Sequence, residues 1–331
     1  MSQEPKTVRG DDAHGAQWAA RIVATGLSAA EGPVIGPEDW ILNVCSMSRA
    51  ATGWPTVGGD IVATRRSEPL RTARVLNTSS STVTGIPAAL AFGPDGCLYV
   101  TDEGHRAILR VDASRAAVPF IDSYSGGRLN GPNDLSFDDD GNLFFTDPWG
   151  SSDIAPVGAV FGYCWASEEL TRIDEGMQFP NGIVVSGDVL YVAETYTRHV
   201  WKYDVTRPGK ARGRRIFCTL PHIEGAPFQG PDGMALDVSG NLHVAHFGSG
   251  GVYVYSGAGE LLDRVAVPGS QPTNVCFGGA HSACSLYVTV DDAGTLVELE
   301  GPTEGMTLPF CPSTFSTHPF SSALVDLEEF A

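Results

Sequence analysis

The chain has 331 residues, of which 42% are hydrophobic and 18% charged, so it is long and apolar enough to bury a sizeable core. Its formal net charge of −18 opposes binding to nucleic-acid phosphates and to anionic membranes, and we expect neither as a partner. The 39 Gly and 22 Pro residues are typical of many short strands joined by tight turns, which favours an all-β fold.

The cysteines and the first residues bear on where the protein is located. The seven cysteines are odd in number and include no Cys-x-x-Cys pair, a pattern of free thiols that suits a reducing compartment. Residues 1–10 are polar and lack the apolar core of a signal peptide. No apolar run approaches the roughly 20 residues that a membrane-spanning helix needs. We therefore predict a cytoplasmic protein, with residues 1–16 as a flexible N-terminus.

A short module, made of a Gly-containing turn and a Leu-aromatic-Val strand, recurs along the chain. Its central Leu or Ile returns every 44 to 57 residues, at Ile41, Leu98, Leu143, Leu190, Leu242 and Leu286. Repeats of about 40–50 residues with several strands each are typical of β-propellers. The sequence therefore predicts one domain over residues 1–331, a single six-bladed β-propeller. A β-sandwich with regular turns is the alternative.

Three segments fall outside the repeated module. Residues 46–60 and 150–166 are interpreted as insertions, and the second contains Phe161, Tyr163 and Trp165. Long loops on a rigid scaffold commonly shape binding sites, although a solvated spacer is an equal alternative for either one. Residues 17–27 are expected to supply a strand that closes the ring with the last blade.

One position of the repeat, about ten residues before each central Leu or Ile, carries a distinctive set of side chains. In chain order it reads Glu31, Ala88, Asn133, Asn181, Asp232 and Thr273. The first strand of a propeller blade lines the central channel, so these side chains should meet on the axis. Carboxylate and amide oxygens suit calcium or magnesium, and two carboxylates would repel each other without a cation. Although Asn-Gly and Asp-Gly alone are common turns, the shared phase predicts a metal site made by Glu31, Asn133, Asn181 and Asp232.

A second ring follows from hairpin geometry, because the next strand returns to the same opening. Four residues after each central Leu or Ile the chain reads Cys45, Asp102, Asp147, Glu194, His246 and Val290. We assign Asp102, Asp147 and Glu194, with the nearby Trp149 and Tyr196, to the surroundings of the metal or the substrate. His246 is a candidate proton-transfer group, because the ordinary pKa of histidine lies near neutrality. The alternative is that these groups only satisfy loop amides.

Four strings resemble the gluconolactonase, senescence marker protein and luciferin-regenerating enzyme family: Ala30–Pro33, Gly131–Asp134, Phe179–Gly182 and Gly230–Gly233. The resemblance spans roughly residues 27–299 and implies a six-bladed, calcium-dependent propeller. It implies that Glu31, Asn133, Asn181 and Asp232 bind the catalytic cation; Mg²⁺, Mn²⁺ and Zn²⁺ are alternatives to Ca²⁺.

The chain also departs from that family pattern. Some sugar-lactonase members carry a sugar-binding arginine two residues before the first asparagine, where this chain has Gly131. The nearest arginine is Arg128, which we assign to the surroundings of the substrate. This difference and the aromatic residues at 161–165 favour a larger or less polar substrate than gluconolactone.

Together these features predict metal-assisted hydrolysis of a small lactone or ester. Asp232 would deprotonate the attacking water, with His246 as the reserve base. The chain has no Gly-x-Ser-x-Gly nucleophile elbow, which favours direct attack by water. Two alternatives stay open: a metal-dependent cyclase or isomerase of secondary metabolism, and a non-catalytic binding propeller. The expected partner is a small-molecule substrate, and the sequence says nothing about the oligomeric state.

Overall fold

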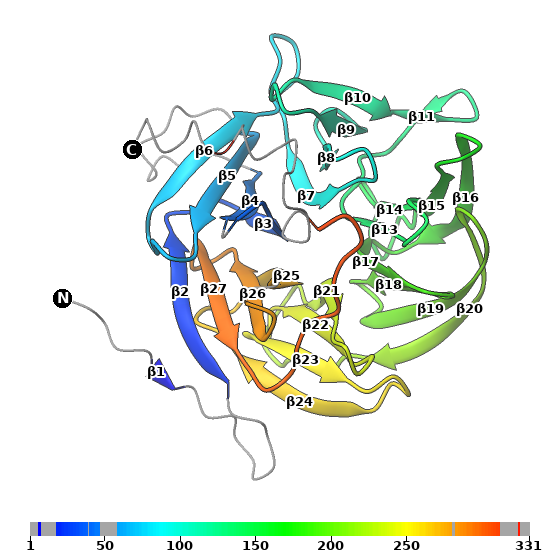
Figure 1. Cartoon of the computed structure of the whole chain (residues 1–331). Coiled ribbons are helices and arrows are strands. Elements are labelled where there is room, and N and C mark those ends of the chain that lie inside the picture. Colours follow the sequence, from blue (N-terminus) through cyan, green and yellow to red (C-terminus); the bar gives the residue numbers. More distant parts are fainter. Residues whose placement is uncertain are drawn as a thin grey trace.

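The computed structural model describes residues 6–7, 18–38, 40–46, 58–279, 282–311 and residue 324. Its strands form six sheets of four or five strands, arranged as a ring around a central axis (Figure 1). This arrangement confirms the predicted six-bladed β-propeller. Each of the six repeated Leu or Ile residues lies in the second strand of its blade, so the module marks one structural position throughout.

The first three blades follow the chain, each with four antiparallel strands in sequence order. Blade 1 consists of β3 (Ala30–Ile35), β4 (Trp40–Cys45), β5 (Asp60–Arg65) and β6 (Thr72–Asn77). Blade 2 consists of β7 (Pro87–Phe92), β8 (Leu98–Asp102), β9 (Ala107–Val111) and β10 (Ala117–Ile121). After a hairpin of β11 (Ser123–Tyr124) and β12 (Gly127–Arg128), blade 3 consists of β13 (Leu135–Phe137), β14 (Leu143–Asp147), β15 (Gly158–Cys164) and β16 (Glu169–Met177).

The last three blades complete the ring. Blade 4 consists of β17 (Pro180–Ser186), β18 (Val189–Glu194), β19 (His199–Arg207) and β20 (Lys210–Thr219). Blade 5 consists of β21 (Gly230–Leu236), β22 (Leu242–Phe247), β23 (Gly251–Tyr255) and β24 (Leu261–Ala266). Blade 6 consists of β25 (Pro272–Phe277), β26 (Ser285–Val290), β27 (Thr295–Glu300), β2 (Ala19–Thr25) and β1 (Lys6–Thr7).

The ring is closed by a strand from the N-terminal part of the chain. β2 pairs antiparallel with β27, from Ala19 opposite Glu300 to Thr25 opposite Thr295. This pairing confirms the closing strand expected at residues 17–27. β1 pairs with β2 through Lys6 and Thr7, and the rest of residues 1–16, where a flexible N-terminus is predicted, lies outside the described residues.

Part of the predicted insertion at residues 150–166 belongs to a blade. Residues 158–164 form β15, which pairs with both β14 and β16. The Phe161 ring stacks on Phe145 with centroids 5.2 Å apart, and Trp165 packs against Phe120 and Tyr163. These aromatic side chains therefore contribute to the core between blades 2 and 3. In the other predicted insertion, residues 47–57 lie outside the described residues.

The axis contains a cavity of about 160 Å³. Apolar side chains of the inner strands line it, Val34, Leu90 and Ile183 among them, together with residues 305–309 and Cys311 from the segment after β27. Main-chain bonds from Met306 N to Leu236 O (2.9 Å) and from Val238 N to Glu304 O (3.0 Å) hold this segment against β21. Figure 1 shows it in orange and red, crossing the ring. It covers one end of the axis, so the predicted metal site lies toward the other end.

Two further expectations concern thiols and membranes. None of the seven cysteines, which all lie in the described ranges, forms a disulfide. Within the described ranges, no helix has the length and apolar character that crossing a bilayer requires.

A buried carboxylate reinforces the ring closure. Glu298 of β27 forms ion pairs with Arg21 of β2 and with Arg66 after β5, the latter with 2.8 Å between Nε and Oε1. Ser285 Oγ donates to the same carboxylate at 2.7 Å. Burial raises the pKa of Glu298, but hydrogen bonds from Arg66, Ser285 and Arg21 outweigh it and hold the pKa below its ordinary value. The carboxylate is therefore charged in the folded protein at neutral pH.

We expect Glu298→Gln to lower the free energy of unfolding at neutral pH by about 1.5–3 kcal/mol, because hydrogen bonds to a charged group contribute about that much. A depressed folded-state pKa gives stability above the unfolded pKa that is lost as the pH falls through the folded pKa, so the difference from wild type should shrink in acid. Urea unfolding at neutral and acidic pH measures both effects. Glu300→Gln, which is exposed on the same strand, is the matched control. Equal stability of Glu298→Gln and wild type at neutral pH would contradict this account.

Candidate functional site

The inner strands are irregular where the predicted ligand residues lie. The pairing register shifts between Glu31 and Val34 in β3, between Pro180 and Ile183 in β17, and between Pro231 and Met234 in β21. Such bulges bend a strand and re-aim one side chain. In blade 3, β13 begins only at Leu135, and a bond from Asn133 N to Thr146 O (3.0 Å) holds the preceding residues. Each candidate ligand residue therefore lies at an interruption of the regular ladder.

The glycines beside these residues allow neighbouring inner strands to approach closely. A Cβ on Gly182 would lie 2.1 Å from the main-chain oxygen of Asp232, and one on Gly233 would lie 2.0 Å from Asn274 Oδ1. A Cβ on Gly32 would lie 2.4 Å from Ala89 Cα. The Asn-Gly and Asp-Gly pairs are therefore close-packing positions inside inner strands. The alternative interpretation, that they are ordinary turns, is wrong.

The structure brings the candidate side chains together at one end of the channel. The Asn181 side chain hydrogen-bonds the carboxyl of Asp232, and the charge of Asp232 acts on Glu31. Asn133 Nδ2 donates to Glu103 Oε1 at 3.1 Å, and the charge of Glu103 acts on both Glu31 and Asp232. Residues from blades 1, 3, 4 and 5 thus share one electrostatic environment.

Threonine hydroxyl groups of one blade hold the main chain near the candidate ligand residues of the next blade. Each bond joins a Thr of one blade to a carbonyl at or next to a candidate ligand residue of the following blade. They run from Thr101 to Asn133 (2.6 Å), from Thr146 to Asn181 (2.6 Å), from Thr195 to Pro231 (2.9 Å) and from Thr273 to Ala30 (2.7 Å). Sequence reasoning placed Thr273 on the axial position but missed the other three, although Thr101 and Thr146 stand at the same place in their copies of the repeat.

Four buried carboxyl groups give this end of the axis its electrostatic character. Burial, followed by the charge of Asp232, raises the pKa of Glu31 well above its ordinary value. Burial, followed by the charge of Asp134, does the same for the pKa of Asp232. Burial also raises the pKa of Glu103 to about 8 and that of Asp134 to about 7. Among the described residues, no Lys, Arg or His forms an ion pair with any of the four.

Two of these carboxyl groups were missed by the sequence analysis. Asp134 directly follows Asn133 in one of the quoted strings, and Glu103 directly follows Asp102 of the second ring. Asp134 accepts main-chain hydrogen bonds from Leu135 (2.8 Å) and Ile183 (3.0 Å), so it links blades 3 and 4 beneath the site.

The donor set fits a hard divalent cation. Carboxyl and amide oxygens suit calcium and magnesium, whereas zinc prefers nitrogen and sulfur ligands. Among the described residues, no three His, Cys, Asp or Glu side chains gather closely enough to hold a metal ion. A metal site here would therefore need the amide oxygens of Asn133 and Asn181 as well as the carboxylates of Glu31 and Asp232.

Two acids of the second ring hold the loops that lead into inner strands. Asp102 accepts the main-chain N–H groups of Ile86 (3.0 Å) and His105 (2.9 Å). Asp147 accepts those of Asn130 (2.8 Å) and Gly131 (2.7 Å). Both carboxylates therefore hold loop amides, and Oδ2 of Asp102 is buried without a hydrogen-bond partner among the described residues.

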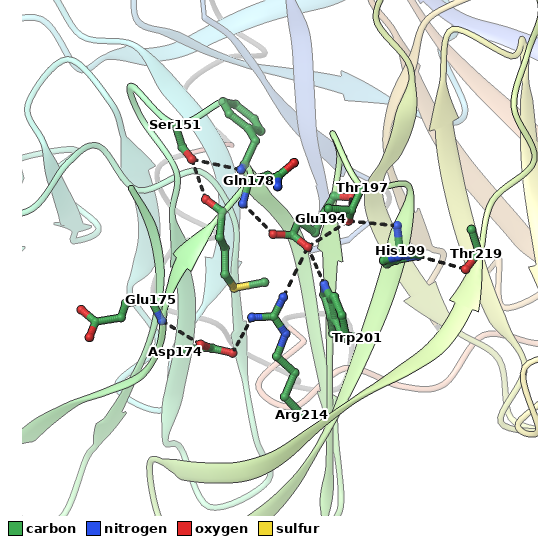
Figure 2. Close-up of polar contacts among 12 residues, drawn as sticks. Ser151, Asp174, Glu175, Gln178, Glu194, Thr197, His199, Trp201, Arg214 and Thr219 are labelled. Atoms are coloured by element: carbon green, nitrogen blue, oxygen red, sulfur yellow. Dashed lines mark hydrogen bonds and ion pairs between the residues drawn. The ribbon is translucent and has the colours of Figure 1, made fainter. Parts of the chain in front are cut away.

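Glu194 has the same role in blade 4 (Figure 2). Its carboxylate accepts Gln178 N at 2.5 Å, Trp201 Nε1 at 2.7 Å and Thr197 Oγ1 at 2.9 Å, and Arg214 lies 3.5 Å away. Gln178 lies three residues before Asn181, so Glu194 positions the segment that leads to this candidate ligand.

His246 is poorly suited to transfer protons at the axis. It is fully buried, and its ring lies 4.9 Å from the Tyr253 ring. Neither ring nitrogen has a hydrogen-bond partner among the described residues. Burial lowers the pKa of His246 to about 4, so the ring is neutral at neutral pH and a weak base. These observations favour Asp232 over His246 as the base.

The three remaining predicted residues lie around the opening or at its flank. Arg128 is turned away, donating to His105 O (2.6 Å) and to Asp122 Oδ2 (3.3 Å). Trp149 is 48% exposed and packs against Gly131, where a Cβ would lie 2.7 Å from Trp149 Cβ. Tyr196 is 38% exposed and follows Thr195, whose hydroxyl accepts from Asn181 Nδ2 at 3.2 Å. Trp149 and Tyr196 therefore lie on the face that bears the candidate ligands.

The fold and this site define a class of protein: six-bladed propellers that gather carboxyl and amide side chains on the axis. Residues 63–291 match the model of the family described as the SMP-30/Gluconolactonase/LRE-like region. The chain belongs to this family, which confirms the resemblance in its sequence.

Individual relatives and structures agree with this placement. The chain is 29% identical over 277 residues to a gluconolactonase from Zymomonas mobilis, covering 78% of this chain and 75% of the relative. It is 33% identical over 257 residues to a diisopropyl-fluorophosphatase from Loligo vulgaris, covering 70% and 79%. A structure of the calcium-binding protein regucalcin from Agrobacterium tumefaciens aligns with a TM-score of 0.70 and 20% identity, covering 89% of this chain and 97% of that one.

The hydroxyl bonds between blades lead to a first prediction for the site. We expect Thr146→Val to lower the free energy of unfolding by about 1–3 kcal/mol, because it leaves the buried carbonyl of Asn181 without its donor. Thr146→Ser keeps the hydroxyl and is the matched control, so it should lose less than Thr146→Val. Urea unfolding measures both variants, and a loss in Thr146→Ser as large as that in Thr146→Val would contradict the assignment of the effect to the hydroxyl.

Proposed function

We propose that the chain is a hydrolase that opens a small lactone or ester with a divalent cation, calcium, on its axis. The observation that carries the proposal is the group of Glu31, Asp232, Asn133 and Asn181, of which Asp232 and Asn181 are buried and Glu31 and Asn133 half-buried. The four share one environment, and among the described residues neither carboxyl group has a cationic side chain as partner. The relatives named gluconolactonase and diisopropyl-fluorophosphatase support a hydrolase, and the calcium-binding neighbour supports calcium.

These four side chains would hold the cation through two carboxylates and two amide oxygens. The two carboxylates match the charge of a dication, and the cation removes their mutual repulsion. When bound, it supplies Lewis-acid polarisation of the substrate carbonyl.

The protein's own residues manage the proton. Asp232 accepts a hydrogen bond from Asn181, which orients its carboxyl group, and it takes the proton of the attacking water. The water oxygen forms a bond to the carbonyl carbon, and the bond between this carbon and the alkoxy oxygen of the ester breaks. The proton then passes from Asp232 to the leaving oxygen. Burial of the surrounding carboxyl groups limits the water that can compete for these bonds.

We expect removal of the cation by exhaustive chelation to abolish turnover of phenyl acetate and of δ-valerolactone, and added calcium to restore it. Asp232→Asn and Glu31→Gln should each lower kcat/KM by at least about a hundredfold and weaken calcium binding in calorimetry. Asp112→Asn is the control, because this exposed carboxylate follows β9 at the opposite end of blade 2 and should change neither quantity. Full activity of the chelated wild-type protein would remove the cation from the mechanism.

Hydrolysis and rearrangement differ in the source of one oxygen atom. In oxygen-18 water, we expect the carboxylate product of phenyl acetate to carry one solvent oxygen, because water is the nucleophile. Mass spectrometry of the product measures this. A turned-over substrate whose product contains no solvent oxygen would favour the cyclase or isomerase alternative.

A further inference from the structure

Four aromatic rings form a continuous chain on the face that bears the candidate ligands. The ring centroids of Phe179 and Tyr196 are 6.3 Å apart, those of Tyr196 and Phe228 5.3 Å, and those of Phe228 and Phe247 5.4 Å. Tyr196 is 38% exposed and Phe228 37%, and Phe179 and Phe247 are partly exposed. We call these four residues the aromatic shelf. Large apolar side chains gathered at a surface commonly mark a binding site.

The aromatic shelf adjoins the two candidate ligands that come from blades 4 and 5. Phe179 lies two residues before Asn181, and Phe228 lies four residues before Asp232. Phe247 is the strand partner of Gly230, at the start of the inner strand of blade 5. The residue before Tyr196, Thr195, accepts from Asn181 Nδ2 and donates to Pro231 O. A substrate whose carbonyl lies over Asn181 and Asp232 would therefore meet these rings.

The backbone at Phe179 adopts a strained conformation. Phe179 has φ 65°, in the left-handed region that bulky residues rarely adopt. The same repeat position, two residues before the axial Asn or Asp, is Gly131 (φ 152°) in blade 3 and Gly230 (φ 157°) in blade 5. Blade 4 thus has an aromatic side chain at a position where blades 3 and 5 have glycine. Bonds from Thr195 N to Phe179 O (3.0 Å) and from Phe179 N to Ser151 Oγ (3.2 Å) hold it in place.

We infer that the aromatic shelf binds the aromatic group of an aryl ester or aryl lactone and thereby sets the substrate class, an inference that rests on the proposed hydrolysis. Aromatic rings offer edge-to-face contacts to another ring, and three of the four shelf residues are Phe, which has no group that could hydrogen-bond the hydroxyls of a sugar. The arginine nearest to the opening in sequence, Arg128, is bonded to Asp122 and His105. The substrate is therefore aromatic at the end that extends over blades 4 and 5.

The test compares dihydrocoumarin, an aryl lactone, with δ-valerolactone, its counterpart without the aromatic ring. For the calcium-loaded wild-type protein, kcat/KM should be higher for dihydrocoumarin. In Phe179→Gly, we expect kcat/KM for dihydrocoumarin to fall about tenfold and that for δ-valerolactone to change less than about threefold. The melting temperature should stay within about 2 °C of wild type or rise, because glycine relieves the backbone strain. Phe228→Ala should shift selectivity in the same direction.

Leu70→Gly is the matched control. Leu70 also has a positive φ (70°) and an exposed side chain, but it lies after β5, at the opposite end of blade 1 from the candidate ligands. It should leave both kcat/KM values unchanged. Equal losses on the two lactones in Phe179→Gly, or a clear drop in its melting temperature, would overturn the substrate assignment and leave the proposed hydrolysis standing. A wild-type protein that opens neither lactone would overturn both.

Discussion

The candidate ligand residues belong to four different blades, so contacts between blades must set the geometry of the site. Two kinds of contact do this. Hydroxyl groups of one blade hold carbonyls of the next, as Thr146 holds Asn181. Glycines such as Gly182 and Gly233 bring the inner strands within backbone contact. Because both contacts act at the ligand residues themselves, an error in blade packing would displace the ligands directly.

Closure of the ring also sets the positions of the inner strands. A propeller holds its inner strands at fixed spacing only if the last blade is joined to the first. Here β2 supplies the fourth main strand of blade 6, and Arg21 and Arg66 reach the buried Glu298 from the two sides of the joint. The bond from Thr273 to Ala30 then crosses the same joint at the axis, next to Glu31. The position of Glu31 therefore depends on both the outer and the inner parts of the closure.

Much of this architecture was predictable because equivalent residues lie at nearly the same sequence distance from the central Leu or Ile in each repeat. The central Leu or Ile marks the second strand of every blade, and counting back from it leads to Glu31, Asn133, Asn181 and Asp232. The same counting could not say which way an acid at a strand end turns, and the structure shows that Asp102, Asp147 and Glu194 each accept main-chain N–H groups of nearby loops. Residues 158–164 were misread as part of a loop, although Phe161, Tyr163 and Trp165 alternate as the residues of a strand do.

Other features depend on contacts between blades that no local pattern encodes. Glu103 comes from a turn of blade 2 and reaches the site only because Asn133 of blade 3 donates to it. The aromatic shelf combines four segments of blades 4 and 5, and its members share no position in the repeat.

The two ends of the axis differ in a way that directs the chemistry. Beneath the carboxyl groups, the cavity of about 160 Å³ is walled largely by apolar inner-strand residues, and the segment from Gly305 to Cys311 covers its far end. An apolar wall lowers the local dielectric, which strengthens both the repulsion among the carboxylates and their attraction to a cation. With one end covered, substrate and cation would enter from the other face, past Trp149 and the aromatic shelf. The proposed cation site and the aromatic shelf proposed to bind the substrate thus lie at the same opening.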